Sequence, residues 1–163
     1  MITVGLSAEV AAPRARVWSA LADPVELAAW RPGLEAEPGS GTWPDAGAAL
    51  LSRARVHGLP LDVRETAVDA TPGERLHVRL HVGLFRCDAT FSLAALGPDR
   101  TRVGLQLQVA NEIPVVGGTL DRFTVRRVAT ELAAARLAGL RDACEAGAPA
   151  PPPGVRPATV PAR

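Results

Sequence analysis

Few residue types in this sequence can perform acid–base or nucleophilic chemistry. The sequence contains three histidines, no tyrosine and no lysine, so every other basic residue is an arginine. Without lysine the chain cannot form a Schiff base, and without tyrosine it has no phenolic acid. Any catalysis must therefore use histidine, arginine, carboxylate, hydroxyl or thiol groups.

His57 is the histidine best placed to transfer a proton. It follows the strand expected over residues 50–56 and precedes Gly58, which predicts a position at the end of a hairpin strand. A histidine near the rim of a cavity titrates close to neutral pH, as general acid–base catalysis requires. A hairpin-end histidine in water is the alternative, and the sequence leaves both open.

Arginines on the expected strands form a second set of candidates. A guanidinium can polarise a carbonyl group or stabilise an enolate in a dry site, because its N–H donors have a fixed geometry. Outer-face salt bridges with Asp62, Glu65 or Asp88 would explain the same arginines equally well. The catalytic candidates are Arg53, Arg64 and Arg86, with Arg55 as a further strand arginine.

The spacing of His77 and His81 argues against a metal site. Four residues apart on one strand, their Cα atoms lie on the order of 13 Å apart, and a structural metal site needs a closer cluster. Both lie on the same face of the expected strand as Arg75 and Arg79, which predicts that this face is the solvated outer one. The sequence also lacks a phosphate-binding glycine loop or a dinucleotide fingerprint, so we predict neither a metal nor a cofactor.

Large side chains are scarce and are therefore candidates for shaping a ligand pocket. The sequence has three Phe, three Trp and one Met, so a sheet curved around a helix would leave interior volume between smaller side chains. A small solid core is the alternative. Cys87 is expected to face inward as a small apolar side chain. The candidate ligand-binding residues are Trp30, Phe85, Cys87, Phe91 and Phe123.

The hydrophobic pattern predicts a strand over residues 2–11, two short helices, about six strands between residues 34 and 111, and a long helix over 114–145. The second short helix begins with Asp23-Pro24-Val25-Glu26, which is typical of a capping box. Strands with one polar face and no intervening helix favour an antiparallel sheet. The stripe of the long helix predicted to cover the sheet comprises Val125, Val128, Ala129, Leu132, Ala135, Gly139, Leu140 and Ala143.

Length and charge narrow the class of protein. The 163 residues fit one domain, predicted over residues 1–146, followed by a flexible proline-rich tail over 147–163. A net charge of +1 does not favour nucleic-acid binding. No apolar run is long enough to span a membrane, and the N-terminus does not match a signal peptide, which predicts a cytoplasmic location.

Several motifs resemble the SRPBCC superfamily, in particular its polyketide cyclase/dehydrase-like members. They are EVAAPRARVW (9–18), LADP (21–24), LAAWRPG (27–33), VDATPGERL (68–76), LGPDRTRV (96–103) and LAGLR (137–141), and the likeness spans about residues 2–145. The resemblance implies an α+β helix-grip, or START-like, fold. In it, a curved antiparallel sheet of about seven strands wraps around a long C-terminal helix, and two short helices follow the first strand.

The resemblance also implies a cavity between the sheet and the last helix. Members of the superfamily bind lipids, hormones or polyketide-like molecules there, and some catalyse cyclisation or dehydration. Two functions therefore stay open: a cofactor-independent cyclase or dehydratase of a polyketide-like substrate, and a non-catalytic carrier or sensor of a hydrophobic molecule. The expected partner is a small hydrophobic ligand, and the expected assembly is a monomer or a homodimer.

Overall fold

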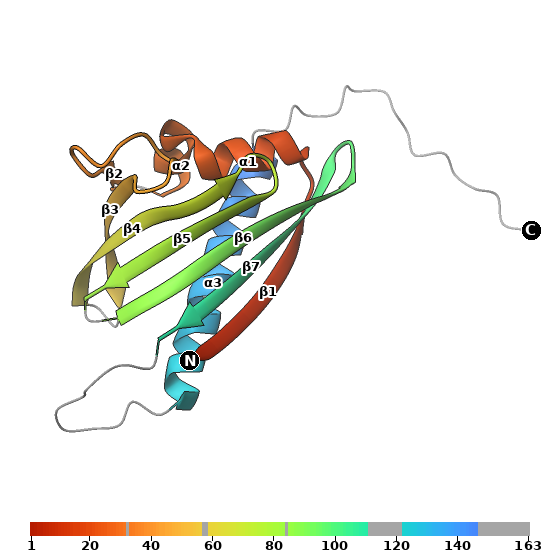
Figure 1. The fold of residues 1–163 in the computed structure, drawn as a ribbon. Helices are drawn as coiled ribbons and strands as arrows, with labels where there is room; N and C mark the ends of the chain where they lie inside the picture. The colour runs from red at the N-terminus through yellow and green to blue at the C-terminus, as the bar shows by residue number, and fades with distance from the viewer. Residues whose placement is uncertain (32, 57–58, 84, 111–121, 147–163) are drawn as a thin grey trace, which may run out of the picture.

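The computed structural model describes residues 1–31, 33–56, 59–83, 85–110 and 122–146. A first strand is followed by two short helices, six strands and a long helix, in the predicted order (Figure 1). The elements are β1 (Ile2–Val10), α1 (Arg14–Ala22), α2 (Pro24–Trp30), β2 (Glu35–Ala36), β3 (Ala49–Val56), β4 (Leu59–Thr71), β5 (Arg75–Val82), β6 (Phe85–Gly97), β7 (Arg100–Val109) and α3 (Arg122–Ala146).

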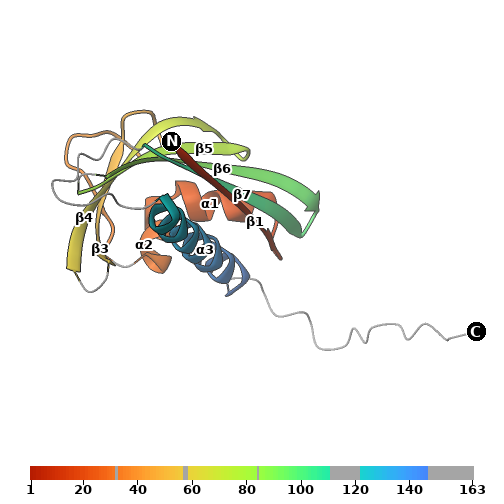
Figure 2. The same cartoon turned by 90° about the horizontal axis from the view of Figure 1, so that it is seen from below.

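The strands form one antiparallel sheet in the order β1-β7-β6-β5-β4-β3-β2. The first strand pairs with the last, from Ile2 opposite Val109 to Val10 opposite Thr101. The sheet is curved, and all three helices lie on its concave side (Figure 2). The predicted α+β helix-grip architecture of seven strands and a long final helix is confirmed.

The start of α2 shows how the local sequence fixes an element. The Asp23 carboxylate accepts a hydrogen bond from the Val25 backbone N–H at 2.8 Å, and Pro24 occupies the first turn. The predicted N-cap is therefore present. Glu26 forms an ion pair with Arg16 of α1, so its carboxylate ties the two short helices together.

Alternation along the strands separates an apolar concave face from a charged outer face. On β5, Leu76, Val78 and Leu80 are buried beneath the helices. Arg75 and Arg79 face outward, where they bind the carboxylates of neighbouring strands. The faces predicted for this strand are confirmed.

The buried stripe of α3 differs from the predicted one. Val128 and Leu132 are 38% and 39% exposed, and Ala135 is also exposed, whereas Ala129 and Leu140 are buried as expected. The helix packs along β1 and β7 at one edge of the sheet (Figure 2), so its buried face is turned toward that edge. Because α3 is rich in small and apolar residues, the spacing alone did not identify that face. The further buried residues are Ala133, Leu137 and Cys144.

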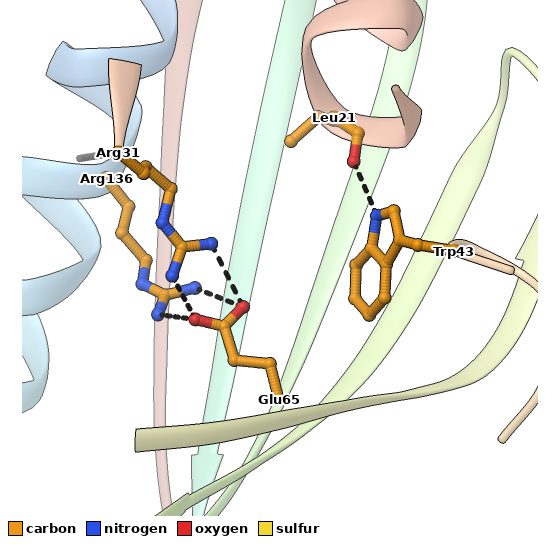
Figure 3. Close-up of polar contacts among 5 residues, drawn as sticks. All are labelled: Leu21, Arg31, Trp43, Glu65 and Arg136. Atoms are coloured by element: carbon orange, nitrogen blue, oxygen red, sulfur yellow. Dashed lines mark hydrogen bonds and ion pairs between the residues drawn. The ribbon is translucent and has the colours of Figure 1, made fainter. Parts of the chain in front are cut away.

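Trp43, in the segment between β2 and β3, is a buried residue that the sequence pattern did not mark. Its indole Nε1–H donates to the Leu21 carbonyl oxygen at 3.0 Å (Figure 3). This bond fastens the segment to the end of α1, on the concave side of the sheet.

The remaining predictions on organisation have different outcomes. Residues 147–163 lie outside the described residues, so the division at residue 146 stays a prediction. Among the described helices, none has the length and apolar character needed to cross a membrane.

Candidate functional site

A buried carboxylate and two arginines meet on the concave side of the sheet (Figure 3). Glu65 of β4 is only 2% exposed. Arg31, at the C-terminal cap of α2, donates to Glu65 Oε2 at 3.1 Å and also to Oε1. Arg136 of α3 donates to Oε1 at 2.8 Å and to Oε2 at 3.5 Å. We call Arg31, Glu65 and Arg136 the buried ion cluster.

Strand alternation and helix packing bring the three residues together. Val63, Glu65 and Ala67 alternate on the buried face of β4, so the Glu65 carboxylate must face the helices. Trp30, next to Arg31, donates its indole N–H to the Ala20 carbonyl at 3.0 Å. Gly139 lets α3 approach this indole closely, since a Cβ there would lie 3.2 Å from the ring. The close approach of α2 and α3 sets the two guanidinium groups side by side.

The electrostatics of the cluster keep Glu65 ionised. Burial alone would raise the pKa of its carboxyl, but the charges of Arg136 and Arg31, with their hydrogen bonds, lower it from 4.5 to about 2. Arginine stays protonated in proteins. The cluster therefore carries two positive charges and one negative charge near neutral pH.

The buried ion cluster borders a small cavity. Its volume of about 10 Å³ is sufficient for roughly one water molecule. Apolar and aromatic side chains make up most of the remaining wall. The lining residues are Leu21, Leu27, Trp30, Arg31, Trp43, Glu65, Leu76, Val78, Phe91 and Arg136.

Incompletely covered apolar side chains lie next to the cluster on the sheet. Strand alternation directs four side chains of β4, β5 and β6 to the concave face, yet they are only half-buried. Ordinary core positions of the same sheet, such as Leu80, are almost fully buried. The half-buried residues are Leu61, Val82, Phe85 and Cys87.

Helix α3 presents a matching apolar side chain. Leu132 lies one turn before Arg136, on the side of the helix that the contact of Arg136 with Glu65 turns toward β4. Figure 1 shows the beginning of α3 at the same end of the sheet as the end of β5 and the beginning of β6. Helix and sheet thus both offer uncovered apolar surface beside the cluster.

A second hollow of about 460 Å³ lies on the outer face of β1, β6 and β7. It is more open, and its outward side chains are hydroxyls, glycines and one glutamine, such as Thr3, Ser92 and Gln106. No titratable side chain lines it. We place the candidate site on the concave side because charged groups and apolar surface occur together there.

The structure places the predicted catalytic arginines apart from the cluster. Arg53 forms an exposed ion pair with Asp62 at 3.1 Å. Arg64 binds the Glu37 carboxylate with its Nε 3.1 Å from both oxygens, and the Arg86 side chain is exposed. His57 lies outside the described residues. The roles assigned to these residues stay predictions.

The alternative of outer-face salt bridges holds for Arg53, which pairs with Asp62. It is wrong for Glu65, which faces the interior and binds Arg31 and Arg136. Its alternation with Val63 and Ala67 was the available signal, because a carboxylate in an apolar row needs a buried partner. Nothing in the local sequence identified Arg31 or Arg136 as that partner.

The predicted ligand-binding residues fall into three environments. Trp30 and Phe91 line the small cavity. Phe85 and Cys87 are half-buried at inward positions of β6, beside the uncovered apolar surface. Phe123, at the beginning of α3, is 81% exposed. The structure thus groups four of the five residues near the buried ion cluster, and their role in binding stays a prediction.

The two thiols are protonated at neutral pH. Burial raises the pKa of Cys87 from 9.0 to about 11, and the nearby charge of Arg136 offsets this only in part. Burial likewise raises the pKa of Cys144 to about 11. Neither is an activated nucleophile. Within the described ranges, no three His, Cys, Asp or Glu side chains gather closely enough to hold a metal ion.

Comparison of the sequence with known protein families identifies the family to which the chain belongs. The profile described as "Polyketide cyclase / dehydrase and lipid transport" matches residues 1–145. The chain belongs to this family. The resemblance inferred from the sequence is thereby confirmed, while a search of curated proteins gave no match.

Solved structures with the fold of this family are similar to the chain at low identity. An aromatase/cyclase, Zhui from Streptomyces sp. R1128, has a TM-score of 0.69 and 21% identity, covering 88% of this chain and 93% of that one. A START superfamily protein from Mycobacterium smegmatis has a TM-score of 0.62 and 22% identity, covering 88% and 94%. The Aha1 dimer from Colwellia psychrerythraea has a TM-score of 0.61 and 16% identity, covering 90% and 98%. These likenesses establish the fold.

Proposed function

We propose that the chain binds a small apolar molecule between α3 and strands β4 to β6. The observation that carries this proposal is the incomplete cover of inward-facing apolar side chains on both elements, such as Phe85 on the sheet and Leu132 on the helix. Exposed apolar surface beside a charged group is typical of ligand sites in soluble proteins. Membership of a cyclase, dehydrase and lipid-transport family supports the same class of ligand.

Titration with Nile red, a neutral apolar fluorophore, tests the proposed location. Leu132→Gln places a polar group on the proposed wall, whereas Leu96→Gln makes the same change at the far end of β6. The two leucines are a matched pair, with exposures of 39% and 40%. We expect Leu132→Gln to weaken binding about fivefold or more, since about 1 kcal/mol of apolar contact is lost. Leu96→Gln should bind as the wild type does. Equal affinities of the two variants, or no binding by the wild type, would contradict the proposal.

Catalysis of a cyclisation or dehydration at the same site is a second candidate function. Two guanidinium groups beside apolar surface favour it, because such groups stabilise an enolate in a dry environment. Incubation with a β-hydroxyketone thioester, followed by mass spectrometry for the loss of one water, tests it. Turnover that His57→Ala abolishes would support catalysis. An unchanged substrate, recovered bound, would leave the carrier function.

A further inference from the structure

We infer that the buried ion cluster recognises a carboxylate on the bound molecule, so that the ligand is an apolar acid rather than a neutral lipid. This inference rests on the proposed function, because it assigns the chemical class of the molecule at that site. Three observations carry it: the charge balance of the cluster, its burial, and the position of the cluster at one end of an apolar surface.

Among the described residues, the buried ion cluster holds one more positive charge than negative charge. Glu65 already accepts hydrogen bonds from both arginines through both of its oxygens. In the described part of the chain, no second carboxylate lies within ion-pair distance of Arg31 or Arg136. On the outer face, by contrast, Arg53 has a carboxylate of its own, that of Asp62.

The excess positive charge is poorly screened by water because both arginines are largely buried. The side chains of Arg31 and Arg136 are 18% and 13% exposed, whereas Arg53 is 73% exposed and shares its charge with water. An unneutralised charge in an apolar environment is unfavourable, and its attraction for an anion is much stronger than in water. A ligand carboxylate would supply the negative charge that the described residues around the cluster do not.

The guanidinium groups also retain donors for a ligand. Each arginine has five N–H donors in a planar fork that matches a carboxylate. Two donors of each point at Glu65, one from each terminal nitrogen. No other acceptor for either guanidinium is found within the part of the chain that the structure describes, so its other donors are available to a second anion.

The shape of the site indicates how such a ligand would lie. The cavity of about 10 Å³ beside the cluster accepts a single ligand oxygen and is too small for a ring. The uncovered apolar surface begins one turn away on α3, at Leu132. An acid with its carboxylate at the arginines and its apolar body along α3 fits both features.

The test compares an acid with its own ester on the wild-type protein. Dansyl-undecanoic acid and its methyl ester differ only at one end, which is a carboxylate in the acid and a neutral methyl ester in the other probe, and their fluorescence reports binding. We expect the acid to bind at least about tenfold more tightly near neutral pH, as a charge-assisted hydrogen bond implies. Equal affinities would overturn the inference while leaving the proposed function intact. Failure of both probes to bind would overturn the proposed function itself.

Variants then identify the charge responsible. Arg136→Gln makes the cluster neutral, so the preference for the acid over the ester should disappear. Arg127→Gln, which removes an 81% exposed arginine from the same helix, is the matched control and should keep the preference. If Arg136→Gln unfolds, Glu65→Gln is the second variant, since it raises the excess charge and should increase the preference. A preference unchanged in a folded Arg136→Gln variant, or reduced in a folded Glu65→Gln variant, would overturn the inference.

Discussion

Arg64 and Glu65 are neighbours on β4, but their side chains lie on opposite faces of the sheet. Arg64 meets Glu37 at an exposed site, where the hydrogen bond from Arg64 lowers the pKa of the Glu37 carboxyl. Glu65 meets two arginines in the interior, where its pKa falls to about 2 despite nearly complete burial. The comparison shows that burial decides what an ion pair does. The outer pairs are screened by water, whereas the buried ion cluster is largely shielded from it, so we expect the cluster to contribute more to stability.

Removing the buried carboxylate of Glu65 should give the largest loss of unfolding free energy among these predictions. Glu65→Ala leaves two guanidinium groups in the interior without their partner, which costs about 3–5 kcal/mol of unfolding free energy. Urea denaturation followed by tryptophan fluorescence measures it. Asp62→Ala on the outer face is the control and should change stability by less than about 0.5 kcal/mol. Similar losses for both variants would show that the two faces do not differ as described.

Protonation of Glu65 at low pH should remove most of the stabilisation that Glu65→Ala removes. The folded-state pKa of Glu65 is lowered from 4.5 to about 2, so its contribution is complete above pH 4.5 and lost as the pH falls toward 2. The shift corresponds to about 3 kcal/mol. Urea midpoints measured across this pH range should fall steeply in the wild type and less in Glu65→Gln. Parallel pH profiles would contradict the assignment of this stabilisation to Glu65.

Removing a buried hydrogen bond between uncharged groups should cause an intermediate loss of stability. The buried Thr101 hydroxyl donates to the Ala12 carbonyl oxygen at 2.9 Å. Thr101→Val removes this donor and should cost about 1–2 kcal/mol. Thr3→Val, at an exposed position of β1, should stay within about 0.5 kcal/mol. Thermal unfolding of both variants tests this difference, which would be refuted by equal melting temperatures.

The smallest effect is expected for an outer-face ion pair. Arg53 and Asp62 are 73% and 85% exposed, and their atoms lie 3.1 Å apart. A double-mutant cycle with Arg53→Gln and Asp62→Asn should give a coupling energy of about 0.5 kcal/mol or less, decreasing with added salt. A coupling above about 1 kcal/mol would mean that exposure is a poor guide to the strength of these pairs.

The fold was predictable because the longer strands and the turns between them carry local patterns. Alternation on β5 and β7, the cap at Asp23 and the turn residues between strands each depend on neighbours in sequence. The face of α3 was not predictable in this way. Its small residues permit several packing faces, and the edge of the sheet against which it lies decides among them.

The site was less predictable than the fold because its residues are distant in sequence. Glu65 carried a local signal, as a carboxylate in an apolar row, but its partners Arg31 and Arg136 are defined only by the docking of two helices. Trp43 lies in a turn-rich segment, and it is buried in the core, where it donates a hydrogen bond to the Leu21 carbonyl. Patterns of alternation identify faces, whereas such contacts depend on tertiary packing.

The sequence separation within the buried ion cluster has a consequence for the order of folding. Glu65 is 34 residues from Arg31 and 71 residues from Arg136. During synthesis the sheet strands emerge before α3, so Glu65 is without one of its two arginines until nearly the whole described chain is available. Contacts of such long range are entropically slow to form. Docking of the final helix is therefore the event that completes the charge arrangement, and the nascent sheet carries a carboxylate on its apolar face until then.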